Sequence, residues 1–134
     1  MLKVDLHSHT NYVIPKRDSN LSPKQLIDFV ASKNYDVLAI TEHASFRTLG
    51  GIKYFNNPLK TYFDFKDYAK KKGVLLIPGV ETFVEGKEVL LINFKGDARK
   101  VKTFDDVRKL REDNILVIAP HPFYVKPSGS QFLY

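Results

Sequence analysis

The sequence has no cysteine and no tryptophan, and its 134 residues include only 7 glycines and 7 prolines. The absence of cysteine excludes disulfide bonds, cysteine-ligated zinc, iron–sulfur clusters and thiol nucleophiles, so a metal site has to consist of histidine and carboxylate side chains. The low glycine and proline content is atypical of a disordered or collagen-like chain. We therefore expect a folded protein whose chemistry uses nitrogen and oxygen donors.

Long apolar segments are also missing from the sequence. No run approaches the roughly 20 residues that a membrane-spanning helix needs. The first residues, from Met1 to Asp5, lack the apolar core of a signal peptide. We expect a cytoplasmic protein that does not contact a membrane.

The length of the chain corresponds to one ordinary domain, so we treat residues 1–134 as a single unit. Its 21 lysines and arginines exceed its 15 aspartates and glutamates, which gives a formal net charge of +6. A positive excess favours anionic partners, such as phosphorylated small molecules, nucleic acid or an acidic surface. Composition alone leaves these alternatives open.

Short apolar runs alternate with amphipathic stretches, a pattern typical of an α/β protein with a parallel sheet and crossover helices. Ser22 and Gln25 predict the start of one helix, and Thr103 predicts the start of another. Glu85-Gly86 predicts the turn of a hairpin. The expected strands cover residues 2–6, 36–41, 74–77 and 115–119 and the hairpin 82–93, and the expected helices cover residues 23–33, 61–72 and 104–112, with a glycine-containing loop around residues 50–51.

All four histidines stand at the carboxyl end of an expected strand, and Glu81 follows another strand in the same way. In parallel α/β folds, functional sites gather at this end of the strands. His7 and His9 are two residues apart, so their side chains leave the strand on the same face, about 6.5–7 Å apart at their origins. A single histidine there is more often an ordinary hydrogen-bonded residue. The joint placement of His7, His9, His43, His121 and Glu81 predicts a metal cluster, in which a shared carboxylate such as Glu81 can bridge two ions about 3.5–4 Å apart.

Four short segments resemble a known family. Asp5-Leu6-His7-Ser8-His9-Thr10, Thr41-Glu42-His43, Gly79-Val80-Glu81 and Pro120-His121-Pro122 resemble, in order and spacing, the first four signature motifs of the polymerase-and-histidinol-phosphatase (PHP) domain family. The resemblance implies a distorted (β/α)7 TIM-like barrel with up to three divalent ions at the strand ends. It also implies hydrolysis of phosphoester bonds in histidinol phosphate, nucleotides or nucleic acid. Histidine and carboxylate ligands suit zinc, manganese and iron alike, so the metal stays open.

The resemblance implies a role for each motif residue. His7, His9 and Glu81 correspond to ligands of a first ion. Glu81 also corresponds to the bridge to a second ion, which His121 binds. These four residues are therefore the expected centre of the site.

Further residues are expected to act around these ions. His43 corresponds to a ligand of a third ion, and either His43 or a water on its ion is our candidate for protonating the leaving oxygen. Asp18 lies where the family often has a polar ligand of the third site. Glu42 stands where many members have aspartate, and we expect it to orient an imidazole without binding a metal. Arg17 and Arg47 are candidate phosphate-binding cations, with ordinary solvated charges as the alternative.

The sequence departs from the family pattern at two points. Many members have a second-site histidine in the segment Glu88-Val89-Leu90-Leu91, where this chain has Leu90, and leucine cannot bind a metal. The last family motif, an Asp-x-His on a late strand, has no counterpart. Since a TIM barrel takes about 250 residues, we expect residues 1–134 to form only the first half to two-thirds of a barrel. We expect its open edge to be covered by a second copy, by a separately encoded chain or by the missing part of a longer gene product.

Three functions remain open at this point. The leading hypothesis is phosphoester hydrolysis by divalent ions that activate a water molecule. The alternative is a non-catalytic metal-binding or assembly module, which Leu90 and the missing motif favour. Nucleic-acid binding is the third, but no RNA-binding aromatic signature is present, and four aromatic side chains are expected to pack inward: Phe29, Phe65, Tyr68 and Phe104.

Overall fold

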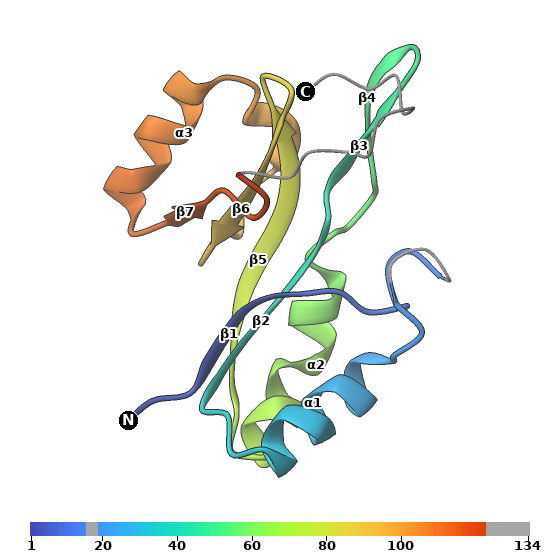
Figure 1. The fold of residues 1–134 in the computed structure, drawn as a ribbon, viewed down its shortest axis with the longest axis vertical. Coiled ribbons are helices and arrows are strands. Elements are labelled where there is room, and N and C mark those ends of the chain that lie inside the picture. The colour runs from blue at the N-terminus through green and yellow to red at the C-terminus, as the bar shows by residue number, and fades with distance from the viewer. Residues whose placement is uncertain (16–18, 123–134) are drawn as a thin grey trace.

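The computed structural model describes residues 1–15 and 19–122. They form an α/β fold in which helices pack against a curled five-stranded sheet with the order β1-β2-β5-β6-β7 (Figure 1). Among the described helices, none is long and apolar enough to span a membrane. The strands of the sheet are β1 (Val4–Ser8), β2 (Val37–His43), β5 (Leu75–Val84), β6 (Lys87–Ile92) and β7 (Leu116–Ile118).

Four of the five strands run in the same direction. β1 pairs with β2 and β2 pairs with β5 in parallel, whereas β6 is antiparallel to both β5 and β7. The expected parallel units are therefore present, and β6, the second strand of the expected hairpin, interrupts them. Because β1, β2, β5 and β7 point the same way, their carboxyl ends lie at one edge of the sheet.

Capping signals in the sequence explain where two helices begin. The Ser22 hydroxyl accepts a hydrogen bond from the Gln25 backbone N–H, and the Gln25 side chain accepts one from the Ser22 N–H. Thr103 and Asp106 form the same reciprocal pair at the later helix. Such pairs satisfy N–H groups that a helix start leaves without partners. The helices are α1 (Pro23–Ser32), α2 (Lys60–Lys71) and α3 (Phe104–Leu110), with short 3-10 turns η1 (Ala98–Lys100) and η2 (Arg111–Asp113) around α3.

The sheet has a helix-bearing face and an opposite face. Leu38 and Ile40 of β2 pack with α1 and α2, and Val80 and Leu91 pack with Val107 of α3. Alternating residues form a small cluster on the opposite face: Ala39, Leu90 and Ile92, with Leu6, Ile77 and Ile118 partly buried against them. We call this opposite face the site face.

Two of the four aromatic side chains expected to face inward are exposed instead. Phe29 has 57% and Phe104 42% of its surface exposed, whereas Phe65 and Tyr68 pack against the core as expected. On α1 the buried stripe is centred on Ile27 and Val30, and a period of 3.6 residues places Phe29 at its flank. Phe104 is the first residue of α3, where the helix begins at the rim of the core.

A second hairpin replaces the expected loop around residues 50–51. β3 (Ser45–Thr48) and β4 (Gly51–Tyr54) pair antiparallel, with Thr48 opposite Gly51. The Ser45 hydroxyl accepts a hydrogen bond from the Phe83 N–H at 2.9 Å, which ties the base of the hairpin to β5. Each strand of this hairpin has only four residues. The two adjacent glycines therefore made the sequence pattern typical of a loop. By contrast, the expected Glu85-Gly86 turn is confirmed, with φ of 47° and 81° at its two residues.

β5 extends well past the expected end at residue 77, because Pro78 and Gly79 continue the strand. Gly79 lies between two close neighbours. A Cβ atom at this position would stand 3.0 Å from the Thr41 Cγ2 atom and 3.2 Å from the Leu91 carbonyl oxygen. The absence of a side chain therefore allows β2 and β6 to pair on both sides of β5, two residues before Glu81.

We predict that Gly79→Ala lowers the free energy of unfolding by about 1–3 kcal/mol, because a backbone carbonyl cannot move aside for the added methyl group. Gly50→Ala is the matched control, since a Cβ atom there meets no atom closer than 3.9 Å. Urea denaturation of both variants measures the difference. Equal midpoints for the two variants would contradict the packing constraint at Gly79.

Candidate metal centre

The predicted site residues converge at the carboxyl edge of the sheet. His7 lies in β1, His9 directly after it, His43 at the end of β2 and Glu81 within β5. His121 follows β7 by three residues. These side chains come from four separate segments of the chain, and the shared strand direction brings them together.

Glu81 stands at the centre of the histidines. Its Oε2 atom lies 3.0 Å from His9 Nε2, 3.4 Å from His43 Nδ1 and 4.0 Å from His7 Nε2. Its Oε1 atom lies 3.9 Å from His121 Nε2. Glu81 is only 2% exposed. Three imidazoles therefore lie near Oε2, and the fourth, His121, lies near Oε1.

Local backbone and side-chain contacts orient the rings. An irregularity in the β1–β2 pairing adds one residue to β1 between Asp5 and Ser8, where such a bulge re-aims the side chains that follow. The His7 Nδ1 atom lies 2.8 Å from the Thr41 hydroxyl, so His7 presents Nε2 to Glu81. The His9 and His43 rings stack, with centroids 4.6 Å apart and planes 11° apart.

The donor set fits divalent metal ions. His9, His43 and Glu81 form one group of three donor atoms within 4.8 Å of one another, and His7, Glu81 and His121 form another. Imidazole nitrogens and a carboxylate are the ligands that zinc, manganese and iron bind in proteins. A cation would also compensate the buried Glu81 charge, because an ion removed from water is costly unless opposite charge lies beside it. The two groups share Glu81, as a bridging carboxylate requires.

The electrostatics favour the metal-binding forms of His7 and Glu81. Burial lowers the pKa of His7, opposed by the Glu81 charge and assisted by the neighbouring imidazoles. Burial raises the pKa of Glu81, but the hydrogen bond from His9 and the charges of the surrounding histidines outweigh it, so the net shift is downward. At neutral pH, Glu81 is therefore ionised and His7 neutral.

Behind the histidines, Glu42 ties the chain after His9 to helix α2. Its carboxylate accepts hydrogen bonds from the Thr10 hydroxyl, from the Thr10 N–H at 3.3 Å and from the Thr61 hydroxyl at 3.0 Å. All three residues are at most 2% exposed. Glu42 therefore acts on His9 through the adjacent Thr10, and the expected direct contact with an imidazole stays a prediction.

The remaining predicted residues lie elsewhere. Asp18 and Arg17 fall outside the described residues. Arg47 lies on the β3–β4 hairpin and is exposed, so its role as a phosphate-binding residue stays a prediction. Leu90 is buried in the apolar cluster of the site face. Glu88 was overlooked in the sequence analysis. This residue lines a cavity together with His121. It stands two residues before Leu90, so strand alternation places both side chains on the site face.

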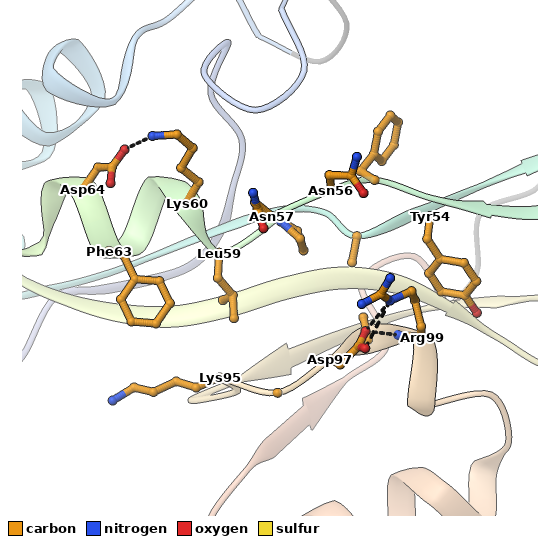
Figure 2. A pocket seen from close by; sticks show the side chains of 15 residues that line it. Tyr54, Asn56, Asn57, Leu59, Lys60, Phe63, Asp64, Lys95, Asp97 and Arg99 are labelled. Carbon is orange, nitrogen blue, oxygen red and sulfur yellow. Dashed lines mark hydrogen bonds and ion pairs between the residues drawn. The ribbon is translucent and has the colours of Figure 1, made fainter.

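A larger cavity of about 620 Å³ lies between the chain before α2 and the segment after β6 (Figure 2). Figure 2 shows that charged side chains in its wall pair with each other, Lys60 with Asp64 and Arg99 with Asp97. None of the four histidines or Glu81 lines it. We therefore assign the candidate site to the histidine cluster.

The fold and the site together define a curled α/β half-barrel with a histidine–glutamate cluster suited to divalent ions. The family model of the PHP domain matches residues 5–124, and the chain belongs to the PHP domain family. It is 28% identical over 130 residues to the uncharacterized protein MJ1587 of Methanocaldococcus jannaschii. This alignment covers 91% of the chain and 68% of that protein.

Two solved structures share the fold. One is a two-domain protein from Bacteroides vulgatus containing a predicted PHP-like metal-dependent phosphoesterase, with a TM-score of 0.63 and 23% identity over 87% of this chain. The other is an amidohydrolase from Chromobacterium violaceum with bound sulfate and no metal, with a TM-score of 0.51 and 21% identity over 84% of this chain. The chain spans about a third, 34%, of each of these proteins.

We predict that the difference in melting temperature between the wild type and Glu42→Gln shrinks as the pH rises. Burial raises the pKa of Glu42 above the ordinary value of 4.5, despite the hydrogen bonds that lower it. Such a group stabilises the fold fully below its unfolded pKa, and this contribution is lost as the pH rises through the folded pKa. Glutamine does not ionise, and its amide nitrogen cannot accept a hydrogen bond. The lost acceptor costs about 1–3 kcal/mol of stability, and the difference between the wild type and the variant is greatest at low pH.

The measurement is thermal unfolding of chelator-treated protein between about pH 4 and about pH 8. Asp67→Asn is the control, because it removes an exposed carboxylate of α2. A wild-type advantage over Glu42→Gln that grows with pH would show that ionised Glu42 is the stabilising form.

Proposed function

We propose that this chain contributes to a divalent-metal-dependent hydrolase that cleaves phosphoester bonds. The observation that carries the proposal is the buried Glu81 carboxylate, whose Oε2 atom lies near His9, His43 and His7 and whose Oε1 atom lies near His121. This is the arrangement of a carboxylate that bridges two ions. The solved relative described as a predicted PHP-like metal-dependent phosphoesterase supports the choice of phosphoester over amide substrates.

The residues of the chain divide the work. His7, His9, His43, Glu81 and His121 would hold the ions, which are zinc, manganese or iron. Bound divalent ions supply an acidified water and stabilise negative charge on the phosphoryl oxygens. His43 faces Glu81 through Nδ1, and we assign its other ring nitrogen, Nε2, to protonating the leaving oxygen. Thr41 holds the tautomer of His7 through its hydroxyl.

The substrate we propose is a phosphorylated small molecule or nucleotide. The net charge of +6 supports an anionic substrate. Arg47, on the exposed hairpin that follows His43, is our candidate for contacting its phosphate. Nucleic acid remains a substrate class of the same chemistry, since each phosphodiester presents the same oxygens.

We predict that His9→Ala lowers the rate of aryl phosphate hydrolysis by more than about 100-fold and reduces bound metal, because His9 is the imidazole nearest to Glu81. A chelator should abolish activity, and added divalent ions should restore it. Lys66→Ala, on the exposed side of α2, is the control. Full activity of His9→Ala, or of chelated wild type, would refute the proposed hydrolysis.

A non-catalytic metal-binding module is the second candidate. Leu90 favours it, because this side chain is 1% exposed and packs beside the site face where the family often has a ligand. Metal bound to the wild type without turnover of any phosphoester would support this module. Turnover by the same sample excludes it.

We further propose that a closed (β/α)7-type barrel forms when additional strands pair with β1 and β7. Among the described strands, β1 pairs only with β2 and β7 only with β6, and Val4 and Leu116 are 45% and 50% exposed at these edges. Unpaired edges of this kind associate with other strands. A second copy of the chain is the partner that we expect for the isolated residues 1–134.

We predict that the 134-residue chain elutes with the mass of a dimer or larger assembly in size-exclusion chromatography with light scattering. Val4→Lys should shift it toward the monomer, because a charge on an edge strand opposes strand pairing. Leu49→Lys is the control, since Leu49 is 97% exposed on the β3–β4 hairpin, away from both edges. A folded wild-type monomer at all concentrations would contradict self-association.

A further inference from the structure

The start of β6 lies at the same edge of the sheet as the histidines. β6 runs antiparallel to β5, and the Glu85-Gly86 turn joins the carboxyl end of β5 to its first residue. In the register of this pair, Leu90 stands opposite Glu81 and Glu88 stands opposite Phe83. Glu88 is therefore two residues nearer than Leu90 to the edge of the sheet where the histidines lie.

Strand alternation places Glu88 on the site face. Leu90 packs there with Ala39 and Ile92, and a residue two positions away in a strand faces the same side. Glu88 is thus the diagonal neighbour of Glu81 across the β5–β6 pair, and such neighbours have separations of roughly 7–8 Å. Two carboxylates at this separation can both reach an ion between them.

His121 occupies the other flank of this position. Glu88 and His121 line the same cavity of about 310 Å³ at the end of β7. His121 Nε2 is 3.9 Å from Glu81 Oε1, and the His121 side chain is 49% exposed. His121 is the member of the group of His7, Glu81 and His121 that lines this cavity, so the cavity joins Glu88 to the group through His121.

We propose that Glu88 is a fourth ligand of the ion held by His7, Glu81 and His121. The inference rests on the proposed function and deepens it. With Glu88, this position has two carboxylates, whereas the group of His9, His43 and Glu81 has one. A site rich in carboxylate oxygen favours manganese, whereas a site rich in imidazole favours softer metal ions. The two positions therefore differ in metal preference, and the Glu88 position takes manganese.

The test counts manganese ions by calorimetric titration and electron paramagnetic resonance of the apo protein. The wild type should bind two ions and show the broadened spectrum of a coupled pair. Glu88→Gln should keep one ion and weaken the other by more than about 10-fold, with an uncoupled spectrum. Asp67→Asn, an exposed carboxylate removed from α2, should behave as the wild type.

Glu88→His is the second variant, and it also decides the matter if Glu88→Gln does not fold. This variant should bind two ions again, and the preference at the second position should shift from manganese to zinc. Replacing a glutamate with a purely structural role would not change the metal preference. Two manganese ions at wild-type affinity in Glu88→Gln, or an unchanged metal preference in Glu88→His, would overturn the assignment of Glu88. A wild type that binds no ion at all would instead overturn the proposed function.

Discussion

Burial of one carboxylate, Glu81, is the constraint on which the site depends. Glu81 is 2% exposed in the middle of β5, and an ion removed from water costs several kcal/mol unless opposite charge or hydrogen bonds replace the solvent. The structure surrounds it with four imidazoles from three other segments. The arrangement is therefore most stable when cations occupy the space between the donors.

Glu81 of β5 and Glu42 of β2 lie on neighbouring strands, and their different surroundings give them different roles. The pKa of Glu81 is lowered because the histidine hydrogen bond and charges around it outweigh burial. The pKa of Glu42 is raised because burial outweighs the hydroxyl and N–H donors of Thr10 and Thr61. Glu81 faces the histidines, whereas Glu42 connects the segment after His9 to α2. The side chains of His43 and Glu42 leave β2 on opposite faces, so one faces the site and the other faces α2.

Much of the fold could be predicted because its signals are local. The Ser22–Gln25 and Thr103–Asp106 caps and the Glu85-Gly86 turn depend on contacts within four residues. The continuation of β5 through Pro78 and Gly79, and the exposure of Phe29, depend on which neighbours pack against them. The short β3–β4 hairpin is tied to β5 through Ser45 and Phe83, 38 residues apart. Sequence patterns do not carry such distant partners.

The sequence by itself determined which side chains are available as ligands, the same-face spacing of His7 and His9, and the strand ends at which the histidines stand. Only the tertiary structure decided how these donors meet. The strand order, the extra residue in β1 and the antiparallel register of β6 place Glu81 between the histidines, Leu90 opposite it and Glu88 beside the edge. The physical reason is that strand pairing joins residues distant in the chain, so no local pattern states the register. Burial of the apolar clusters on both faces of the sheet selects it.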